Sequence, residues 1–460
     1  METKYGITEK EMEAARHCIE CARGLGAEGV RVSLSKNVLD TVALLNGGVD
    51  KVTHCADRSI YLYLYIDGKY GTYSTNLLEK DQVEDFIRRA VEATRMLTKD
   101  EFRKLPEPSR CERNAVSGLE LGLYDPAYAG ITPRQRMEMA MAGSIFPGDD
   151  AQGDTYRIIS EECEWTDSVD DNYVIDSQGF EGRHIETSFS FWTEVTICGK
   201  DGKKYSGYSW SASPRLKEVS KEGCSQEALE KAVAQMNPKR VKSGKRIMVV
   251  DCNSSSRLVS PLLSALNASA VQQKNSFLKD SLDKKVFSGD FFLDDLARTP
   301  GKAGSRLFDT EGVATADRTL IEGGVVRTFF VNTYMAGKTG MEPTVEGVSR
   351  PVVRPFSVIP DSRPVIPDLS KEEIMRQCDE GILVTGFNGG NCNQTTGDFS
   401  YGIEGFLFRK GRIVHPVKEM VITGNMTDLW NSIIAAGSDE REGTRWQIPT
   451  LAFKNVTFNS

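Results

Sequence analysis

Four residues late in the sequence have side chains suited to acid–base chemistry. Asp398, Ser400 and Glu404 lie close together beside glycines, and His415 follows one predicted strand later. A carboxylate and an imidazole within reach of each other can act as a general acid and base. Residues of these types in turns more often cap and hydrogen-bond the local backbone. A self-sufficient hydrolase that uses Asp398, Glu404 or His415 is therefore kept as an alternative.

Other catalytic motifs are absent from the sequence. It contains no HExxH zinc-protease motif, no GxSxG nucleophile elbow and no P-loop. His184 and Glu186 form an HxE, but the PCxxC that a zinc deaminase also needs is missing. One GxGxxG, Gly24 to Gly29, leaves a predicted helix and enters a predicted strand, which is the reverse of the order in dinucleotide-binding folds. These five classes of site are therefore not expected.

The ten cysteines have no regular spacing, and no secretory signal precedes them. Reduced thiols are the expectation for such a chain. Cys18 and Cys21 form a lone CxxC on a predicted helix, without the second pair of ligands that a four-ligand zinc site requires. Both are interpreted as structural residues.

Charge and hydropathy limit the partners of the chain. A net charge of -8 argues against a nucleic-acid partner, because binding to phosphates needs clustered Lys and Arg. The clearest basic cluster, from Lys239 to Arg246, is interpreted as a solvated linker. No apolar run reaches the roughly 18 residues of a membrane span, and Met1 to Thr8 does not resemble a signal peptide. We expect a cytoplasmic protein with no nucleic-acid or membrane partner.

The hydrophobic pattern that must position these residues predicts an α+β fold. Residues 1–105 form an N-terminal α/β unit with a mixed or antiparallel sheet, residues 106–236 a helix plus an antiparallel meander, and residues 237–460 a β-rich C-terminal domain with a large antiparallel sheet. Thr8 and Glu11 predict the capping box of the first helix, and Asp67-Gly68 predicts a hairpin turn. The first unit is expected to contain strands near residues 30–34, 39–45, 49–54 and 59–66.

Two further stretches of the C-terminal part stand out. Ser254 to Lys274 has a helical pattern, and Pro261 fits the first turn if the helix begins near Ser260. Gly340 to Asp368 holds six prolines and is either a lid or binding loop or an ordered surface crossing. Thr385 to Asn425 reads as a Gly-rich loop that feeds two strands, a place where functional side chains often lie.

This Gly-rich stretch resembles the TldD/PmbA family, whose members are named as modulators of DNA gyrase. The sequence TTGDFSYGIEGFLFRKGRIVHPVKEMVITGN (Thr395 to Asn425) is similar to the late signature of the family. Further matches follow the order of the family: SQGFEG (Ser177 to Gly182), KNSFLKDSLDKKVF (Lys274 to Phe287), the segment Phe308 to Gly340, and NMTDLWNSI (Asn425 to Ile433).

The resemblance implies a cytoplasmic zinc metalloprotease made of two related subunits. The TldD-like subunit carries an HExxxH helix and a later cysteine that hold zinc, and the PmbA-like subunit, also called TldE, lacks them. Here Asn253 to Lys279 contains no His, Glu, Asp or Cys, and Ser438 to Phe453 contains no Cys. The chain is thus expected to be the PmbA/TldE-like member, with no catalytic residue and no metal of its own, and with zinc only in a TldD-like partner.

In this interpretation the chain helps to shape a cleft for unfolded or extended peptides, which would add to an exposed sheet edge as an extra strand. Purely structural turn roles remain the alternative for the cleft candidates. A protein-binding modulator of DNA gyrase is also kept as an alternative, and a homodimer of the isolated chain is left open. The cleft candidates are Gly389, Gly390, Asn393, Gly397, Asp398, Ser400, Gly402 and Asn425.

Overall fold

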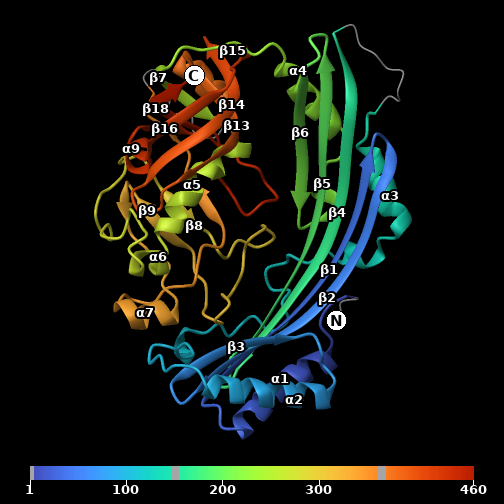
Figure 1. The fold of residues 1–460 in the computed structure, drawn as a ribbon, viewed down its shortest axis with the longest axis vertical. Helices are drawn as coiled ribbons and strands as arrows, with labels where there is room; N and C mark the ends of the chain where they lie inside the picture. The colour runs from blue at the N-terminus through green and yellow to red at the C-terminus, as the bar shows by residue number, and fades with distance from the viewer. Residues whose placement is uncertain (1–4, 147–154, 360–368) are drawn as a thin grey trace. The chain divides into compact units, whose positions relative to one another are not determined.

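The computed structural model describes residues 5–146, 155–359 and 369–460. The chain divides into two compact units (Figure 1). The N-terminal unit comprises Met1–Leu229, Ala297–Ala316 and Val331–Gly347, and the C-terminal unit comprises Glu230–Leu296, Asp317–Phe330 and Val348–Ser460. The units are not contiguous in the sequence, and the predicted three-part division after residues 105 and 236 stays a prediction.

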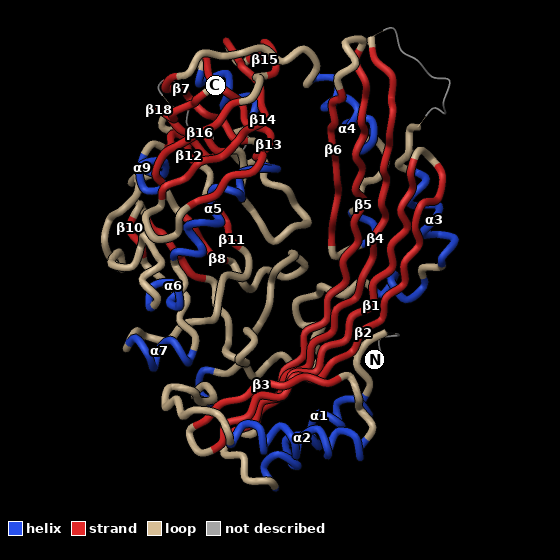
Figure 2. The backbone as a smooth tube through the Cα atoms, viewed as in Figure 1, coloured by secondary structure: helices blue, strands red, loops and turns tan. Residues whose placement is uncertain are grey.

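The N-terminal unit is built on a six-stranded sheet in the order β3-β2-β1-β4-β5-β6, in which every neighbouring pair is antiparallel (Figure 2). The strands are β1 (Gly29–Leu45), β2 (Gly48–Ile66), β3 (Lys69–Thr75), β4 (Tyr156–Asp176), β5 (Glu181–Gly199) and β6 (Lys204–Ser213). The predicted Asp67-Gly68 turn joins β2 to β3, with φ of 51° and 71° at its two residues.

The short strands predicted between residues 30 and 66 merge into two long ones. Residues 30–34 and 39–45 both belong to β1, and residues 49–54 and 59–66 both belong to β2. The polar residues between them remain extended because they pair with one another across the hairpin, Lys36 with Arg58 and Asn37 with Asp57. Hydrogen bonds to neighbouring strands therefore override the break in the hydrophobic alternation.

Helices α1 (Glu9–Gly24) and α2 (Lys80–Arg95) cover one face of this sheet around a shared core. The predicted capping box of Thr8 and Glu11 starts α1. The Glu11 carboxylate also accepts hydrogen bonds from Lys36 on β1 and Arg58 on β2. Burial acts to raise the pKa of Glu11, but the bonds from Arg58 and Thr8 and the charge of Lys36 lower it to about 2. One carboxylate thus ties the start of α1 to two strands.

A second core lies around α3 (Pro133–Ala142), β1, β4 and β5, and contains Trp165 and Phe191. Its buried charges are paired, because Arg136 on α3 donates to the Asp167 carboxylate at 2.7 Å. The other helices of the chain are α4 (Cys224–Ala234), α5 (Cys252–Ala265), α6 (Ala268–Gln272), α7 (Thr333–Thr339), α8 (Lys371–Cys378) and α9 (Met426–Asn431). Among the described residues, none of the helices has the length and apolar character of a membrane span.

The C-terminal unit contains a ring of five strands. Its members are β7 (Gly244–Val250), β13 (Glu380–Cys392), β14 (Asp398–Arg409), β16 (Met420–Asn425) and β18 (Leu451–Asn459). Neighbours pair in the order β7-β13-β14-β16-β18, and β18 pairs with β7 to close the ring. All pairings in the ring are antiparallel except β7 with β13. The predicted α+β class with a large, mainly antiparallel C-terminal sheet is thus confirmed.

Shorter strands extend this unit. β15 (Arg412–Pro416) pairs with β14, and β12 (Phe356–Ser357) and β17 (Ile433–Ala436) continue the sheet beyond β18. A separate sheet has the order β10-β9-β8-β11, formed by β10 (Val325–Val326), β9 (Arg318–Glu322), β8 (Leu293–Asp295) and β11 (Pro351–Val353).

Two predictions for the C-terminal part, the helix from Ser254 and the Pro-rich stretch, can be compared with the structure. The helical pattern predicted for Ser254 to Lys274 forms α5 and α6, and α5 begins at Cys252, so Pro261 lies inside the helix and not in a first turn near Ser260. The side chain of Asp251 caps this earlier start by accepting from the Asn253 amide at 2.9 Å. The Pro-rich stretch contains β11 and β12 up to residue 359, and its remainder, residues 360–368, lies outside the described residues.

Candidate functional site

The Gly-rich stretch forms β13, β14 and β16, three adjacent strands of the ring. Gly389 and Gly390 lie near the end of β13, Asn393 and Gly397 lie in the turn that follows, and Asp398, Ser400 and Gly402 lie on β14. Asn425 ends β16 and caps α9 by accepting from the Thr427 amide at 3.0 Å. Adjacent strands thus bring all eight candidates into one region of the C-terminal unit.

Three of the candidates hold the turn in shape. The Asn393 side chain accepts from the Thr395 amide at 2.9 Å. The Asn425 Nδ2 donates to the Thr396 carbonyl at 2.8 Å and to Asp398 Oδ1 at 2.9 Å. Hydrogen bonds from Asn425 and Thr396 lower the pKa of Asp398. These polar groups are engaged with their neighbours, as the structural alternative for them predicts.

Two of the glycines allow β13 and β14 to pair. A Cβ on Gly390 would lie 2.0 Å from the Ser400 carbonyl oxygen, and φ at Gly390 is +79°. A Cβ on Gly402 would lie 2.4 Å from the Asn388 carbonyl oxygen. Both glycines adjoin a break in the β13–β14 register between Asn388 and Asn391. The close backbone approach that they permit is therefore made by the neighbouring strand.

One edge of β13 extends past its neighbour. β13 pairs with β14 over most of its length, but with β7 only at Ile382–Val384. In the part of the chain that the structure describes, no strand pairs with residues 386–392 on the β7 side; we call this segment the β13 edge. Residues 388–391 of this edge are exposed. An exposed strand edge offers unpaired backbone donors and acceptors.

Helix α5 runs beside the β13 edge and supplies residues that sequence reasoning missed. Ser254 Oγ donates to the Thr385 carbonyl at 2.7 Å, and Arg257 Nη2 donates to the Gly390 carbonyl at 3.1 Å. The exposed Arg257 guanidinium also lies over the Tyr401 ring, 5.2 Å from its centroid. Nothing in the spacing of Ser254 and Arg257 marks them, because their role depends on the pairing of α5 with a distant strand.

The residues proposed for acid–base chemistry are not assembled by the ring. Asp398 pairs with Asn425 at one end of β14, whereas His415 pairs with Leu407 near the other end. Nine residues of extended strand span roughly 30 Å, so Asp398 and His415 lie far apart. Glu404 accepts from the Asn388 side chain at 2.8 Å, and His415 Nδ1 lies 2.9 Å from the carbonyl oxygen of Pro416. The geometry offers no acid–base pair here.

The start of α5 is held by ion pairs and amide contacts. Lys371 Nζ forms an ion pair with the Asp251 carboxylate at 2.9 Å, and Arg441 Nε donates a hydrogen bond to the Asn253 side chain at 2.7 Å. Burial acts to raise the pKa of Asp251, but the Lys371 ammonium lowers it overall. Burial and the nearby Asp251 carboxylate raise the pKa of the Cys252 thiol to about 12.

This set of residues does not fit a catalytic zinc ion. Catalytic zinc takes three protein ligands from His, Cys, Asp or Glu and leaves one position open. Asp251 and Cys252 are of ligand type, but Asp251 is paired with Lys371, and two such residues are fewer than the three ligands of a catalytic zinc site. Asn253 to Lys279 supplies no residue of ligand type.

Comparisons with known proteins match most of the chain. Residues 243–460 match the family described as PmbA/TldA metallopeptidase C-terminal domain, and residues 131–236 match the PmbA/TldA metallopeptidase central domain. A metalloprotease PmbA homolog of Buchnera aphidicola is 24% identical over 432 residues, covering 93% of this chain and 92% of the relative. Metalloprotease PmbA of Escherichia coli O157:H7 is also 24% identical, covering 93% and 91%.

Solved structures show the same fold. A Bacteroides thetaiotaomicron protein called a modulator of DNA gyrase is 38% identical with a TM-score of 0.92, covering 99% of this chain and all of the other. TldE from Thermococcus kodakarensis has a TM-score of 0.79 at 18% identity, over 97% of this chain.

Proposed function

Because this chain belongs to the PmbA/TldD metallopeptidase family, we propose that it is the PmbA/TldE-like, non-catalytic subunit of a two-subunit zinc protease. In this role it shapes a cleft for unfolded or extended peptides in the cytoplasm, and a TldD-like subunit supplies the catalytic zinc. A zinc ion polarises the scissile carbonyl and activates water when it is bound in such a protease.

The observation that carries this proposal is the start of α5. Lys371 and Arg441 engage Asp251 and Asn253 there, and Asn253 to Lys279, where the resemblance places the zinc helix, contains no His, Glu, Asp or Cys. Two positive side chains there also oppose binding of a cation. The chain therefore keeps the fold of a metallopeptidase family with a donor set that favours ion pairing over metal binding.

The β13 edge supports the second part of the proposal. An extended peptide can add to an exposed strand through main-chain hydrogen bonds, which depend little on the peptide sequence. Asn388, Gly389, Gly390 and Asn391 are exposed, and Gly389 has no atom within 4 Å of the Cβ that it lacks. Arg257 adds a positive charge that can pair with a peptide carboxylate.

The test is to mix the purified chain with a TldD-like subunit and to follow complex formation by size-exclusion chromatography with light scattering. We expect a mixed complex, and we expect cleavage of an unfolded protein only in the mixture. A chain that forms no complex with a TldD-like subunit would contradict the proposed role.

A further inference from the structure

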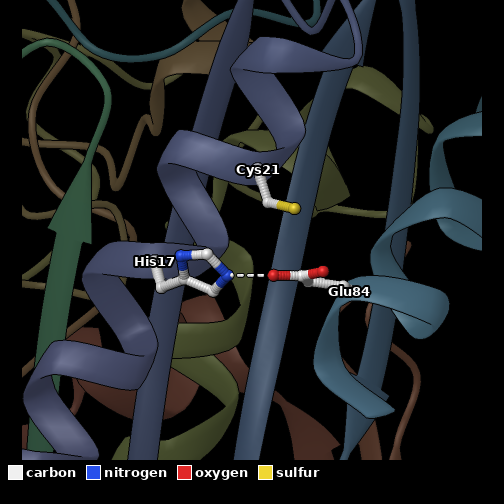
Figure 3. A group of neighbouring side chains, drawn as sticks. All are labelled: His17, Cys21 and Glu84. Carbon is white, nitrogen blue, oxygen red and sulfur yellow. Dashed lines mark hydrogen bonds and ion pairs between the residues drawn. The ribbon is translucent and has the colours of Figure 1, made fainter. Parts of the chain in front are cut away.

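A group of three side chains outside the C-terminal unit has the composition of a metal site. His17 and Cys21 lie on α1, and Glu84 lies on α2 (Figure 3). The imidazole nitrogen, the thiol sulfur and a carboxylate oxygen all lie within 4.8 Å of one another. Figure 3 shows the three side chains pointing toward a common point between the helices.

The helical spacing explains this arrangement. Residues four apart on a helix lie on the same face, so His17 and Cys21 face α2 together. Cys18 points into the core and is 1% exposed, which leaves Cys21 as the accessible thiol of the CxxC. His17 Nε2 lies 2.9 Å from Glu84 Oε1. The side chains of His17 and Glu84 are 30% and 35% exposed, so an ion from solvent can reach them.

The mixture of ligands indicates the class of metal. Imidazole nitrogen together with thiolate sulfur suits zinc and related transition metals, whereas magnesium and calcium prefer oxygen ligands alone. Two ligand atoms bound tetrahedrally to zinc lie about 3.3 to 3.6 Å apart, by the usual bond lengths. The present ligand atoms lie within 4.8 Å of one another, so a shift of roughly 1 Å separates them from this arrangement.

A second observation concerns the other nitrogen of the imidazole. His17 Nδ1 lies 3.8 Å from Glu20 Oε2, one helical turn along α1. Metal-bound histidines commonly direct their second nitrogen to a carboxylate, which fixes the orientation of the ring. A surface hollow of about 320 Å³, lined in part by Lys10, His17 and Lys80, opens beside the group. Of the three side chains only His17 lines this hollow, so solvent reaches the imidazole from that side.

We propose that His17, Cys21 and Glu84 bind one zinc-class transition-metal ion that fastens α1 to α2. This site belongs to the N-terminal unit and is separate from the catalytic zinc expected in a TldD-like partner. It departs from the sequence-based expectation that this chain holds no metal. The main competitor is Lys80, whose ammonium lies 4.0 Å from Glu84 Oε1, but that side chain is 72% exposed and free to move into solvent.

Cobalt(II) titration of the reduced full chain tests the proposal, because thiolate-bound cobalt absorbs strongly in the near ultraviolet. We expect one cobalt per chain with this band, displaced by zinc, and no band in Cys21→Ser. His17→Ala and Glu84→Gln should bind more weakly than wild type, and Glu20→Gln should lose roughly tenfold in affinity as an outer partner. Cys55→Ser, which alters a half-exposed cysteine on β2, should leave the band unchanged.

Two results would overturn the metal site: a wild-type chain without the thiolate band, or a band that persists in Cys21→Ser. Circular dichroism of each variant verifies folding, and His17→Ala repeats the test without altering the thiol. Zinc that remains bound in the Cys21→Ser, His17→Ala double variant would instead indicate a second site and contradict the proposed function. The failures of the two proposals are therefore distinguishable.

Discussion

At the start of α5, single residues decide what the chain can do chemically. Lys371 forms an ion pair with Asp251, and Arg441 donates a hydrogen bond to Asn253. The side chains of Asp251 and Asn253 therefore stabilise the C-terminal unit. Asp251 is 6% exposed, and a buried carboxylate is tolerated when a cation and backbone amides satisfy it. The same contacts stabilise this corner and favour ion pairing over metal binding at Asp251 and Asn253.

The stability of a Gly390→Ala variant tests how closely β14 packs on Gly390. In Gly390→Ala the new methyl group would lie 2.0 Å from the Ser400 carbonyl oxygen at a φ of +79°. The left-handed backbone costs about 1 kcal/mol for alanine, and overpacking adds about 1–3 kcal/mol. We expect urea unfolding to show a loss of about 3 kcal/mol.

Gly389→Ala is the matched control for this substitution. Its φ is +66°, but no atom lies within 4 Å of the added methyl group. It should therefore lose only the backbone cost of about 1 kcal/mol. Equal losses for the two variants would show that the β13–β14 contact at Gly390 is not tight.

At the scale of elements, Glu11 links α1 to β1 and β2 in a pH-dependent way. Its pKa falls from the ordinary value of 4.5 to about 2 on folding. A carboxylate with a lowered folded pKa adds stability above its unfolded pKa, and this stability is lost as pH falls from about 4.5 toward 2. The urea midpoint of wild type should therefore drop more steeply below pH 4.5 than that of Glu11→Gln. Parallel curves for the two proteins would contradict this role.

If a peptide adds to the β13 edge as a strand, its binding depends on main-chain hydrogen bonds. Successive backbone amides of an extended peptide point to opposite edges of the strand. Only every second amide of a bound peptide can therefore donate to β13. Methylation of one alternating set of peptide amides should weaken binding to this chain, measured by fluorescence anisotropy. Methylation of the other set, which faces away, is the control and should change little. If both sets weaken binding equally, the peptide does not add as a strand.

Local signals in the sequence predicted local elements well. The Thr8–Glu11 capping box and the Asp67-Gly68 turn depend on a few adjacent residues, and both are present. The lengths of β1 and β2 were not predicted, because Lys36 and Arg58 stay extended only through pairing across the hairpin. The helical pattern from Ser254 predicted α5, but the side chain of Asp251 caps a start at Cys252, so Pro261 lies inside the helix and not in its first turn.

At the scale of the whole molecule, the missing predictions concern contacts between distant segments. The ring closes through β7 with β13 and β7 with β18, pairings across more than a hundred residues that no hydrophobic period encodes. His17 and Cys21 stand four apart on a predicted helix, but Glu84 joins them only through the packing of α1 on α2. The eight cleft candidates lie close together in the sequence and stay a prediction, whereas Ser254 and Arg257 came to light only through the fold.

We propose that this chain supplies part of a peptide cleft and no catalytic metal. The most direct test is the rate at which an unfolded protein is cleaved while this chain is titrated into a fixed amount of a TldD-like subunit. We expect no cleavage by this chain alone, and a rate that rises to saturation at an equal amount of the two subunits. Loss of the HExxxH glutamate from the TldD-like subunit should abolish the activity. Cleavage by this chain alone, persisting in the presence of a metal chelator, would contradict the account.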